Sequence, residues 1–147
     1  MFVIKKLEKE SDFNGSLNQE TFVNFLHQHL DKFRDPKTDI NKSIDYAFSE
    51  SAGKGGFLLT GYYLGNLAAA LVMNQTGMEG FIPENILVYV AVDSQYRNQG
   101  FGKQIVRSAF DHAEGDVKLH VEYDNPAKRL YERLGMTTKY AEMRYYK

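Results

Sequence analysis

The chain has 147 residues, of which 43% are apolar and 25% charged, values typical of one globular domain with a single hydrophobic core. A formal net charge of -1 gives no broad attraction for nucleic-acid backbones or anionic membranes, and every apolar stretch is far shorter than the roughly 20 residues that a membrane-spanning helix needs. The absence of cysteine excludes disulfides, thiolate metal sites and a cysteine nucleophile together.

The first third of the chain predicts one strand followed by two helices. Residues 2–7 form an apolar-led run with β-branched side chains, which is typical of a strand. Apolar residues then recur at steps of three and four over 22–33, the pattern of one buried helix face. Asp35 and Pro36 predict the cap and the first-turn proline of a second helix, whose apolar stripe covers 40–48.

A hairpin is predicted in the middle of the chain. Residues 51–56 are rich in Gly and Ser and indicate a loop. Residues 57–63 and 67–74 are then predicted as two antiparallel strands. They are joined through a short connection in which Gly65 and Asn66 suit a tight turn.

The second half of the chain predicts a unit of strand, helix and strand. Residues 86–92 are nearly all apolar, as expected for a central strand covered on both faces. Residues 102–114 carry apolar side chains on one face, and Gly115 is placed to end this helix. Residues 117–123 alternate between apolar and polar, which predicts a strand parallel to the previous one if the crossover is right-handed.

The end of the chain predicts one more helix and one more strand. Residues 124–126, Asp-Asn-Pro, open a helix that Gly135 ends. Residues 138–146 are predicted as the last strand. The order of elements therefore predicts a single α/β domain with a mixed sheet over residues 1–147.

The segment from Asp93 to Lys103, between the apolar strand and its helix, has the features of an anion site. The first N–H groups of a helix lack intrahelical partners and carry the positive end of its dipole. Gly100 and Gly102 let the backbone approach a ligand, and Arg97 adds positive charge beside Lys103. The pattern predicts a diphosphate site, although a turn from strand to helix also needs glycine for its conformation alone.

Two other phosphate-binding motifs fit less well. Gly100 and Gly102 resemble the start of a dinucleotide fingerprint, with Glu122 near the expected acidic position, but Ile105 replaces the third glycine. The chain is also too short for two mononucleotide-binding halves. Residues 53–56 lack the first glycine and the Ser or Thr of a Walker motif.

Two motifs together resemble the GNAT superfamily of N-acetyltransferases. Arg97-Asn-Gln-Gly100-Phe-Gly102 matches its Arg/Gln-x-x-Gly-x-Gly/Ala signature, after a strand that ends at 90–93. Residues 124–136 resemble the family's Asn-x-x-Ala-x-x-x-Tyr-x-x-x-Gly-Phe ending, with Met136 in place of Phe. The resemblance implies a single N-acetyltransferase domain with a mixed, mostly antiparallel sheet, helices on both faces, and a central parallel strand pair splayed to hold acetyl-CoA.

The resemblance also implies that residues 86–114 bind acetyl-CoA, with the pyrophosphate at the amides of residues 99–103. The open strand at Val90 and Val92 would pair with the pantetheine arm. Asn125 would contact the cofactor near its thiol end, or only cap the helix that follows it. The implied cofactor-binding residues are Val90, Ala91, Val92, Arg97, Asn98, Gln99, Gly100, Phe101, Gly102, Lys103 and Asn125.

Acetyl transfer to an amine needs a proton acceptor for the amine and a proton donor for the leaving thiolate. The resemblance implies that Tyr131 is the general acid, although alone it would be a core tyrosine on a helix face. The strand glutamate that serves as base in some family members corresponds to about Ile86, which cannot accept a proton. Glu84 is therefore a candidate base, and Glu122 and His120 on the neighbouring strand are further candidates.

The sequence thus predicts an acetyl-CoA-dependent N-acetyltransferase in which a primary amine of a small molecule or peptide attacks directly in a ternary complex. A catalytically silent acyl-CoA-binding or sensing domain is the alternative. No secretory signal is recognised, so we expect a cytoplasmic protein without nucleic-acid, membrane or metal partners. The tyrosine-rich end at 140–146 is compatible with a homodimer, and Asp31, Asp35, Asp39 and Asp45 with a cationic acceptor or with ordinary solvated helix charges.

Overall fold

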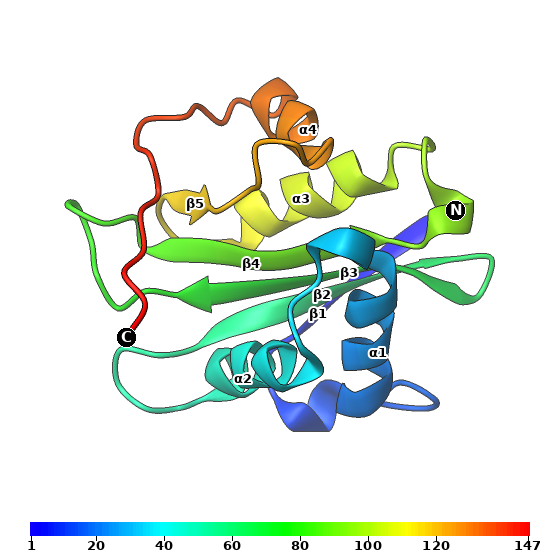
Figure 1. Ribbon diagram of the computed structural model, residues 1–147. Coiled ribbons are helices and arrows are strands. Elements are labelled where there is room, and N and C mark those ends of the chain that lie inside the picture. Colours follow the sequence, from blue (N-terminus) through cyan, green and yellow to red (C-terminus); the bar gives the residue numbers. More distant parts are fainter.

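The computed structural model describes all 147 residues and shows a five-stranded sheet (Figure 1). All neighbouring strands are antiparallel except the last two, which are parallel. The mixed, mostly antiparallel sheet expected from the sequence is therefore confirmed. In spatial order, the strands are β1 (Phe2–Leu7), β2 (Gly56–Tyr63), β3 (Asn66–Gln75), β4 (Asn85–Val92) and β5 (Val117–Leu119).

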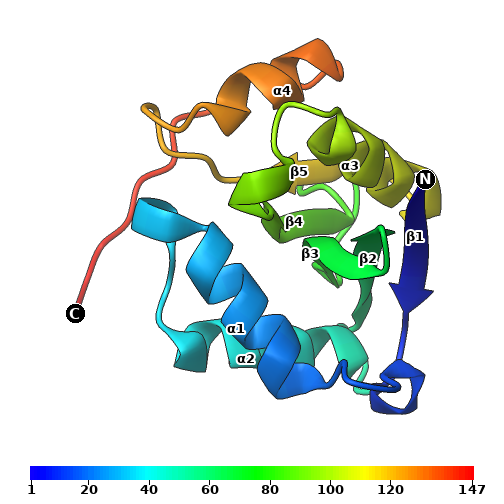
Figure 2. The same ribbon diagram turned by 90° about the vertical axis from the view of Figure 1, so that its right-hand side faces the viewer.

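Two pairs of helices cover the two faces of this sheet (Figures 1 and 2). One face carries α1 (Gln19–His29) and α2 (Lys37–Phe48), and the other carries α3 (Phe101–His112) and α4 (Ala127–Arg133). None of these helices is long and apolar enough to cross a membrane. Because β4 and β5 are parallel and α3 connects them, the predicted strand-helix-strand unit is present, and α3 begins near the C-terminal end of β4.

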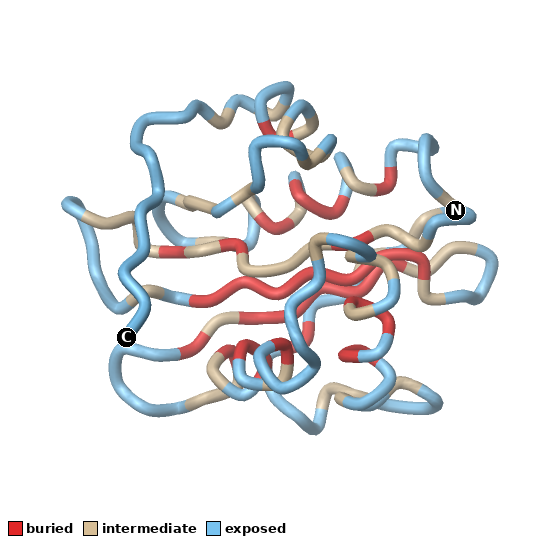
Figure 3. Tube along the Cα trace, viewed as in Figure 1, coloured by how far each residue is buried: buried red, intermediate tan, exposed pale blue.

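The core has one apolar layer on each face of the sheet. Phe22, Leu26 and Ile44 belong to the layer under α1 and α2, whereas Ile105 belongs to the layer under α3 and α4. β3 is the most deeply buried strand, with residues 68–74 buried throughout (Figure 3). β4, predicted as the covered central strand, is only partly buried because the short strand β5 covers only its first part.

Two helices end earlier than their sequence patterns predict. The helix predicted over 22–33 ends at His29, because Asp31 takes a φ of 54°, a left-handed conformation that does not continue a right-handed helix. A separate 3₁₀ turn follows it. α3 ends at His112 because Ala113 is extended, two residues before the end expected from the position of Gly115.

The start of α2 also differs from the prediction. Pro36 is the residue before the helix rather than part of its first turn. Asp35 does not cap the helix, because its carboxylate accepts a hydrogen bond from the Tyr89 hydroxyl, 2.5 Å away. This contact joins the connection between α1 and α2 to β4.

The strands differ from the prediction at one turn and at the C-terminal end. The β2–β3 turn is centred on Leu64 and Gly65, because two residues with positive φ fit the twist of a hairpin, so Asn66 already lies in β3. The strand predicted over 117–123 is only three residues long. The strand predicted over 138–146 is absent: these residues are exposed and pair with no neighbouring strand.

Candidate active site

The turn from β4 into α3 presents a row of free main-chain donors. Asn98 (φ 65°) and Gly100 (φ 82°) both take left-handed conformations, and the first helical bond runs from Gln104 N to Gly100 O at 3.1 Å. The N–H groups of residues 97–103 donate to no acceptor in the chain. They lie at the positive end of the α3 dipole, so this row of donors fits a bound diphosphate.

The two glycines of this turn serve different purposes. Gly100 has open space where a side chain would start, so glycine is required there by its positive φ. At Gly102, a Cβ atom would lie 3.3 Å from Leu130 and 3.7 Å from Val92. Gly102 therefore allows α3 to pack closely against α4 and β4, whereas the sequence suggested that it clears space for a ligand.

β4 leaves one edge open beside this turn. It pairs with β5 only over Asn85–Leu87, and at Val88 the register with β3 shifts, which marks a β-bulge. Asp93 donates its N–H to β3 at 2.8 Å, so by strand alternation the main-chain groups of Val90 and Val92 face the opposite, open side. The splayed parallel pair expected from the sequence is therefore present.

Arg97 is engaged by main-chain oxygens rather than left free for a ligand. Its guanidinium donates to Val92 O at 3.3 Å and to His29 O at 2.8 Å. Lys103, in contrast, is exposed and forms no ion pair. The cation available to a phosphate at this turn is consequently Lys103, and Arg97 instead holds the turn against the end of α1.

His29 is a site residue that sequence reasoning placed only in a helix pattern. Its imidazole Nε2 lies 3.7 Å from Asp93, and its Nδ1 accepts the N–H of Ser94 at 3.4 Å. Burial, opposed by the charge of Asp93, lowers the pKa of His29. A neutral imidazole in this position supports the turn without adding charge to it.

Tyr131 combines a buried ring with an accessible hydroxyl. The residue is only 8% exposed and packs in the apolar layer that contains Val90, Val92 and Ile105. Its hydroxyl forms no hydrogen bond within the chain, but the hydroxyl oxygen is accessible to solvent rather than fully buried. Burial, followed by the charge of Glu122, raises the pKa of Tyr131 to about 12, so the phenol is protonated at neutral pH.

Asn125 lies one residue before Pro126, the cap residue of α4, and forms a local hydrogen bond at the start of this helix. Its side-chain oxygen accepts the N–H of Ala127 at 2.9 Å, and its amide nitrogen lies 3.4 Å from the Glu122 carboxylate. These contacts fix the start of α4. Asn125 therefore positions the helix that carries Tyr131.

Glu84 has a structural partner that disfavours it as the base. Its carboxylate accepts the N–H of Asp116 at 2.7 Å, and this backbone hydrogen bond lowers the pKa of Glu84. A Cβ atom at Gly115 would overlap the same carboxylate. Glu84 also precedes β4, at the end away from the α3 turn. It ties the start of β4 to the turn between α3 and β5.

The other two candidate bases are also engaged. His120 lies 3.7 Å from the carboxylate of Glu142, and burial lowers its pKa. Glu122 is exposed and within reach of the Asn125 amide. No cluster of three His, Cys, Asp or Glu side chains is arranged to hold a metal ion. Each of the three candidate bases therefore has a contact within the chain.

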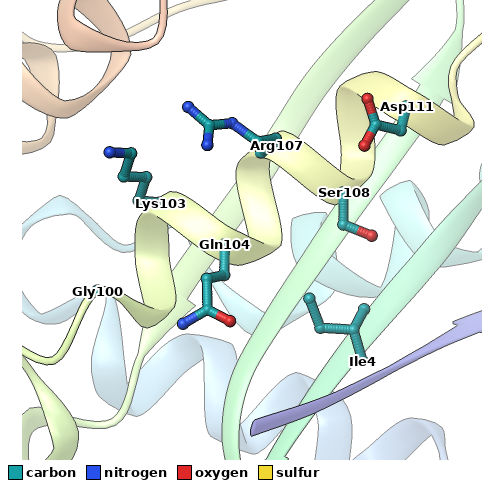
Figure 4. A pocket seen from close by; sticks show the side chains of 7 residues that line it. All are labelled: Ile4, Gly100, Lys103, Gln104, Arg107, Ser108 and Asp111. Carbon is teal, nitrogen blue, oxygen red and sulfur yellow. The ribbon is translucent and has the colours of Figure 1, made fainter.

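A shallow groove of about 510 Å³ runs along the flank of α3 that faces β1 (Figure 4). In this view, Gln104 and Ser108 point toward Ile4, whereas Lys103 and Arg107 point away from it. Gly102 faces the other flank, toward β4 and α4. The groove is thus adjacent to the α3 turn but separate from the open edge of β4.

Solved structures share this fold. Ribosomal-protein-alanine N-acetyltransferase from Brucella melitensis biovar Abortus 2308 has a TM-score of 0.68 at 15% identity, with 99% of each chain covered. Glucosamine-6-phosphate N-acetyltransferase from Arabidopsis thaliana has a TM-score of 0.60 at 21% identity, covering 99% of this chain and 98% of that one. Aminoglycoside N-acetyltransferase AAC(6')-Iy in complex with CoA has a TM-score of 0.70 at 11% identity, covering 100% and 95%.

Family comparison agrees with these structures. No curated protein matches the chain. Residues 17–136, however, match the model described as the acetyltransferase (GNAT) family. The acyl donor of that family is acetyl-CoA, which confirms the cofactor expected from the sequence. This match agrees with the two sequence motifs and with the splayed parallel pair of the sheet. The chain belongs to the GNAT family of acetyltransferases.

Proposed function

We propose that this protein transfers the acetyl group of acetyl-CoA to a primary amine of a small molecule or peptide, which attacks directly in a ternary complex. The observation that carries the proposal is that two sets of unpaired main-chain groups lie next to each other. The open edge at Val90 and the Val92 N–H leads into the free N–H groups of residues 97–103. A molecule with amides along its length and a diphosphate at one end satisfies both sets, and coenzyme A has this layout.

Each part of the donor has a set of residues that fits it. The N–H groups of residues 99–103, with the charge of Lys103, would hold the diphosphate. The open main-chain groups of Val90 and the N–H of Val92, whose carbonyl already accepts from Arg97, would hold the pantetheine amides, and an amide near Val90 would stabilise the oxyanion. Acetyl-CoA supplies an activated acyl carbon and a thiolate leaving group. Arg97 contributes by holding Val92 and the turn in place.

Tyr131 is the proton donor of the proposed reaction. A pKa of about 12 keeps its phenol protonated at neutral pH. Because a thiol has a pKa of about 8.5, full proton transfer from this phenol to the thiolate is uphill. Tyr131 therefore acts first as a hydrogen-bond donor that stabilises the negative charge developing on sulfur.

Amine acetylation is supported by the range of proteins that share the fold. Their names include acetyltransferases of aminoglycosides, of glucosamine 6-phosphate and of a ribosomal-protein alanine. These acceptors differ widely in charge and size but share an amine. A primary amine is therefore the acceptor chemistry we propose for this chain.

The proposal is tested by binding and then by turnover. Calorimetry with acetyl-CoA is expected to show binding, and free coenzyme A should compete for the same site. Thiol release is then measured with sisomicin, with glucosamine 6-phosphate and with a peptide that begins with alanine. The absence of acetyl-CoA binding would contradict the proposal, and binding without turnover on any amine would support the silent acyl-CoA-binding alternative.

We also infer a homodimer from the C-terminal segment. Tyr140, Met143, Tyr145 and Tyr146 are all highly exposed there, which is unusual for large apolar side chains on a monomer. Light scattering at micromolar concentration is expected to give twice the chain mass. A chain truncated after Thr137 should be monomeric, and a full-length monomer would contradict the inference.

A further inference from the structure

The connection between α1 and α2 places a carboxylate beside β4. Asp35 Oδ2 accepts the Tyr89 hydroxyl at 2.5 Å, across 54 residues of sequence. Burial, with the hydrogen bond to Asp35 and the charges of Asp35 and Asp39, raises the pKa of Tyr89 above its ordinary range. Tyr89 is therefore a permanent donor to this carboxylate near neutral pH.

Tyr89 lies at the point where the sheet opens. It is two residues past Leu87, the last β4 residue paired with β5, and it directly precedes Val90. Its side chain belongs to the apolar layer under α1 and α2, whereas Tyr131 belongs to the layer under α3 and α4. The two phenols therefore lie on opposite faces of the sheet beside the same open edge.

Asp35 itself is held in place but not neutralised. It is exposed, its Oδ1 atom has no hydrogen-bond partner, and it forms no ion pair. Three basic side chains nearby in the sequence contact other carboxylates instead: Lys32 lies 3.6 Å from Asp124, Arg34 4.0 Å from Asp31, and Lys42 3.9 Å from Asp39. Lys37 also forms no ion pair with Asp35. A carboxylate oriented by one donor, with its second oxygen free, can accept a proton from a ligand.

We propose that Asp35 is the proton acceptor for the attacking amine and that Tyr89 is its positioning residue. The proposal rests on the proposed acetyl transfer. As the lone pair of the acceptor nitrogen forms the C–N bond to the acyl carbon, the proton on nitrogen passes to Asp35 Oδ1. The C–S bond breaks with its electron pair on sulfur, where Tyr131 donates a hydrogen bond, and Asp35 later returns its proton to water.

The timing of this proton transfer follows from acidity. A free alkyl ammonium has a pKa of about 10, and a carboxylate is a much weaker base than the amine, so Asp35 cannot efficiently deprotonate the free cation. The amine must arrive neutral, and its remaining protons become acidic only as the C–N bond forms. Asp35 thus takes a proton late in the attack, which places its contribution in kcat rather than in acceptor binding.

The kinetic test compares variants with the acceptor that the wild-type protein turns over fastest among sisomicin, glucosamine 6-phosphate and the alanine peptide. Asp35→Asn is expected to lower kcat about a hundredfold while KM changes by less than about threefold. Asp35→Glu should restore part of this loss, and Tyr89→Phe should lower kcat by about tenfold. Asp39→Asn is the matched control, because it removes the same charge nearby, and its kcat should stay near that of the wild type.

Two outcomes would overturn the proposal. If Asp35→Asn keeps its kcat, Asp35 does not accept a proton in the reaction. If Asp35→Asn and Asp39→Asn raise KM equally, the carboxylate only attracts a cationic acceptor. The wild-type protein distinguishes this failure from failure of the proposed function: acetyl-CoA binding with turnover leaves the function intact. Turnover of none of these amines would overturn both proposals together.

A second measurement does not depend on turnover. Both the wild-type protein and Tyr89→Phe are titrated and followed by ultraviolet absorbance. The difference between the two curves gives the ionisation of the Tyr89 phenol. This phenol is expected to titrate above the ordinary tyrosine range, and Asp35→Asn should move it down. An unchanged titration in Asp35→Asn would show that the two side chains do not contact in solution, and it would overturn the positioning role of Tyr89.

Discussion

The Arg97 guanidinium donates to the main-chain oxygen of His29 at 2.8 Å, a contact that joins residues 68 positions apart in the sequence. The same guanidinium donates to Val92 O at 3.3 Å. One side chain therefore fixes the last turn of α1, the end of β4 and the turn that precedes α3. Arg97 thus links α1 to the proposed acetyl-CoA site.

Replacement of Arg97 should weaken donor binding through the position of the turn. We expect Arg97→Ala to lower the free energy of unfolding by about 1 kcal/mol and acetyl-CoA affinity by about fivefold, because two exposed charge-assisted hydrogen bonds are lost. Arg97→Lys should lose as much, since a single ammonium does not reproduce the forked contact. Calorimetry measures both, with the exposed Arg107→Ala as control. Full affinity in Arg97→Lys would indicate that only the charge of Arg97 matters.

Removal of the Tyr131 hydroxyl should separate catalysis from binding. Tyr131→Phe keeps the buried ring and removes only the proposed hydrogen-bond donor, so kcat is expected to fall about a hundredfold with acetyl-CoA affinity unchanged. Tyr123→Phe is the matched control, because Tyr123 is 83% exposed and eight positions earlier in the chain. Steady-state thiol release and calorimetry check the two quantities. Equal kcat values in the two variants would remove Tyr131 from the proposed mechanism.

The sequence predicted the fold, the family and its cofactor because their signals are local. Gly100 takes the positive φ that the turn into α3 needs, and the alternation of strand residues leaves Val90 and the Val92 N–H facing the open edge. The Asp35–Tyr89 and Arg97–His29 contacts have no local signal, because they exist only after α1 and its connection to α2 pack on β4.

The absent last strand illustrates the same limit. Residues 138–146 have the tyrosine-rich composition of a strand. A strand also needs a neighbouring strand whose main-chain N–H and C=O groups are free to pair with it. β5 has only three residues and offers little for such pairing. Strand propensity alone therefore predicted an element that the tertiary structure does not contain.

Gly100 should be required for its backbone conformation rather than for space. We expect Gly100→Ala to reduce the free energy of unfolding by about 1–2 kcal/mol, because its φ of 82° is left-handed and disfavours a Cβ atom. Gly100→Asn should lose less, since asparagine tolerates this region better. Urea denaturation of both variants measures the difference. Equal stability of the Ala and Asn variants would contradict a conformational requirement.

Glu84 should stabilise the fold in a pH-dependent manner without taking part in turnover. The hydrogen bond from Asp116 N lowers the pKa of its carboxyl from the ordinary value of 4.5, so the folded state binds this proton more weakly than the unfolded state. The stabilisation is therefore fully present above pH 4.5 and is lost as the pH falls through the lower pKa of the folded state.

Glu84→Gln tests this role directly. The variant should be less stable than the wild-type protein at neutral pH, and the difference should shrink as the pH falls below about 4, because the wild-type carboxylate then becomes protonated and loses its advantage. Glu79→Gln is the control, since Glu79 is an exposed glutamate on the same connection between β3 and β4. Denaturant titrations across pH give the stabilities, and thiol release gives kcat, which should stay near the wild-type value. A carboxylate that only ties β4 to the α3–β5 turn should change stability and leave kcat unchanged. A large fall in kcat with unchanged stability would therefore indicate that Glu84 is the catalytic base.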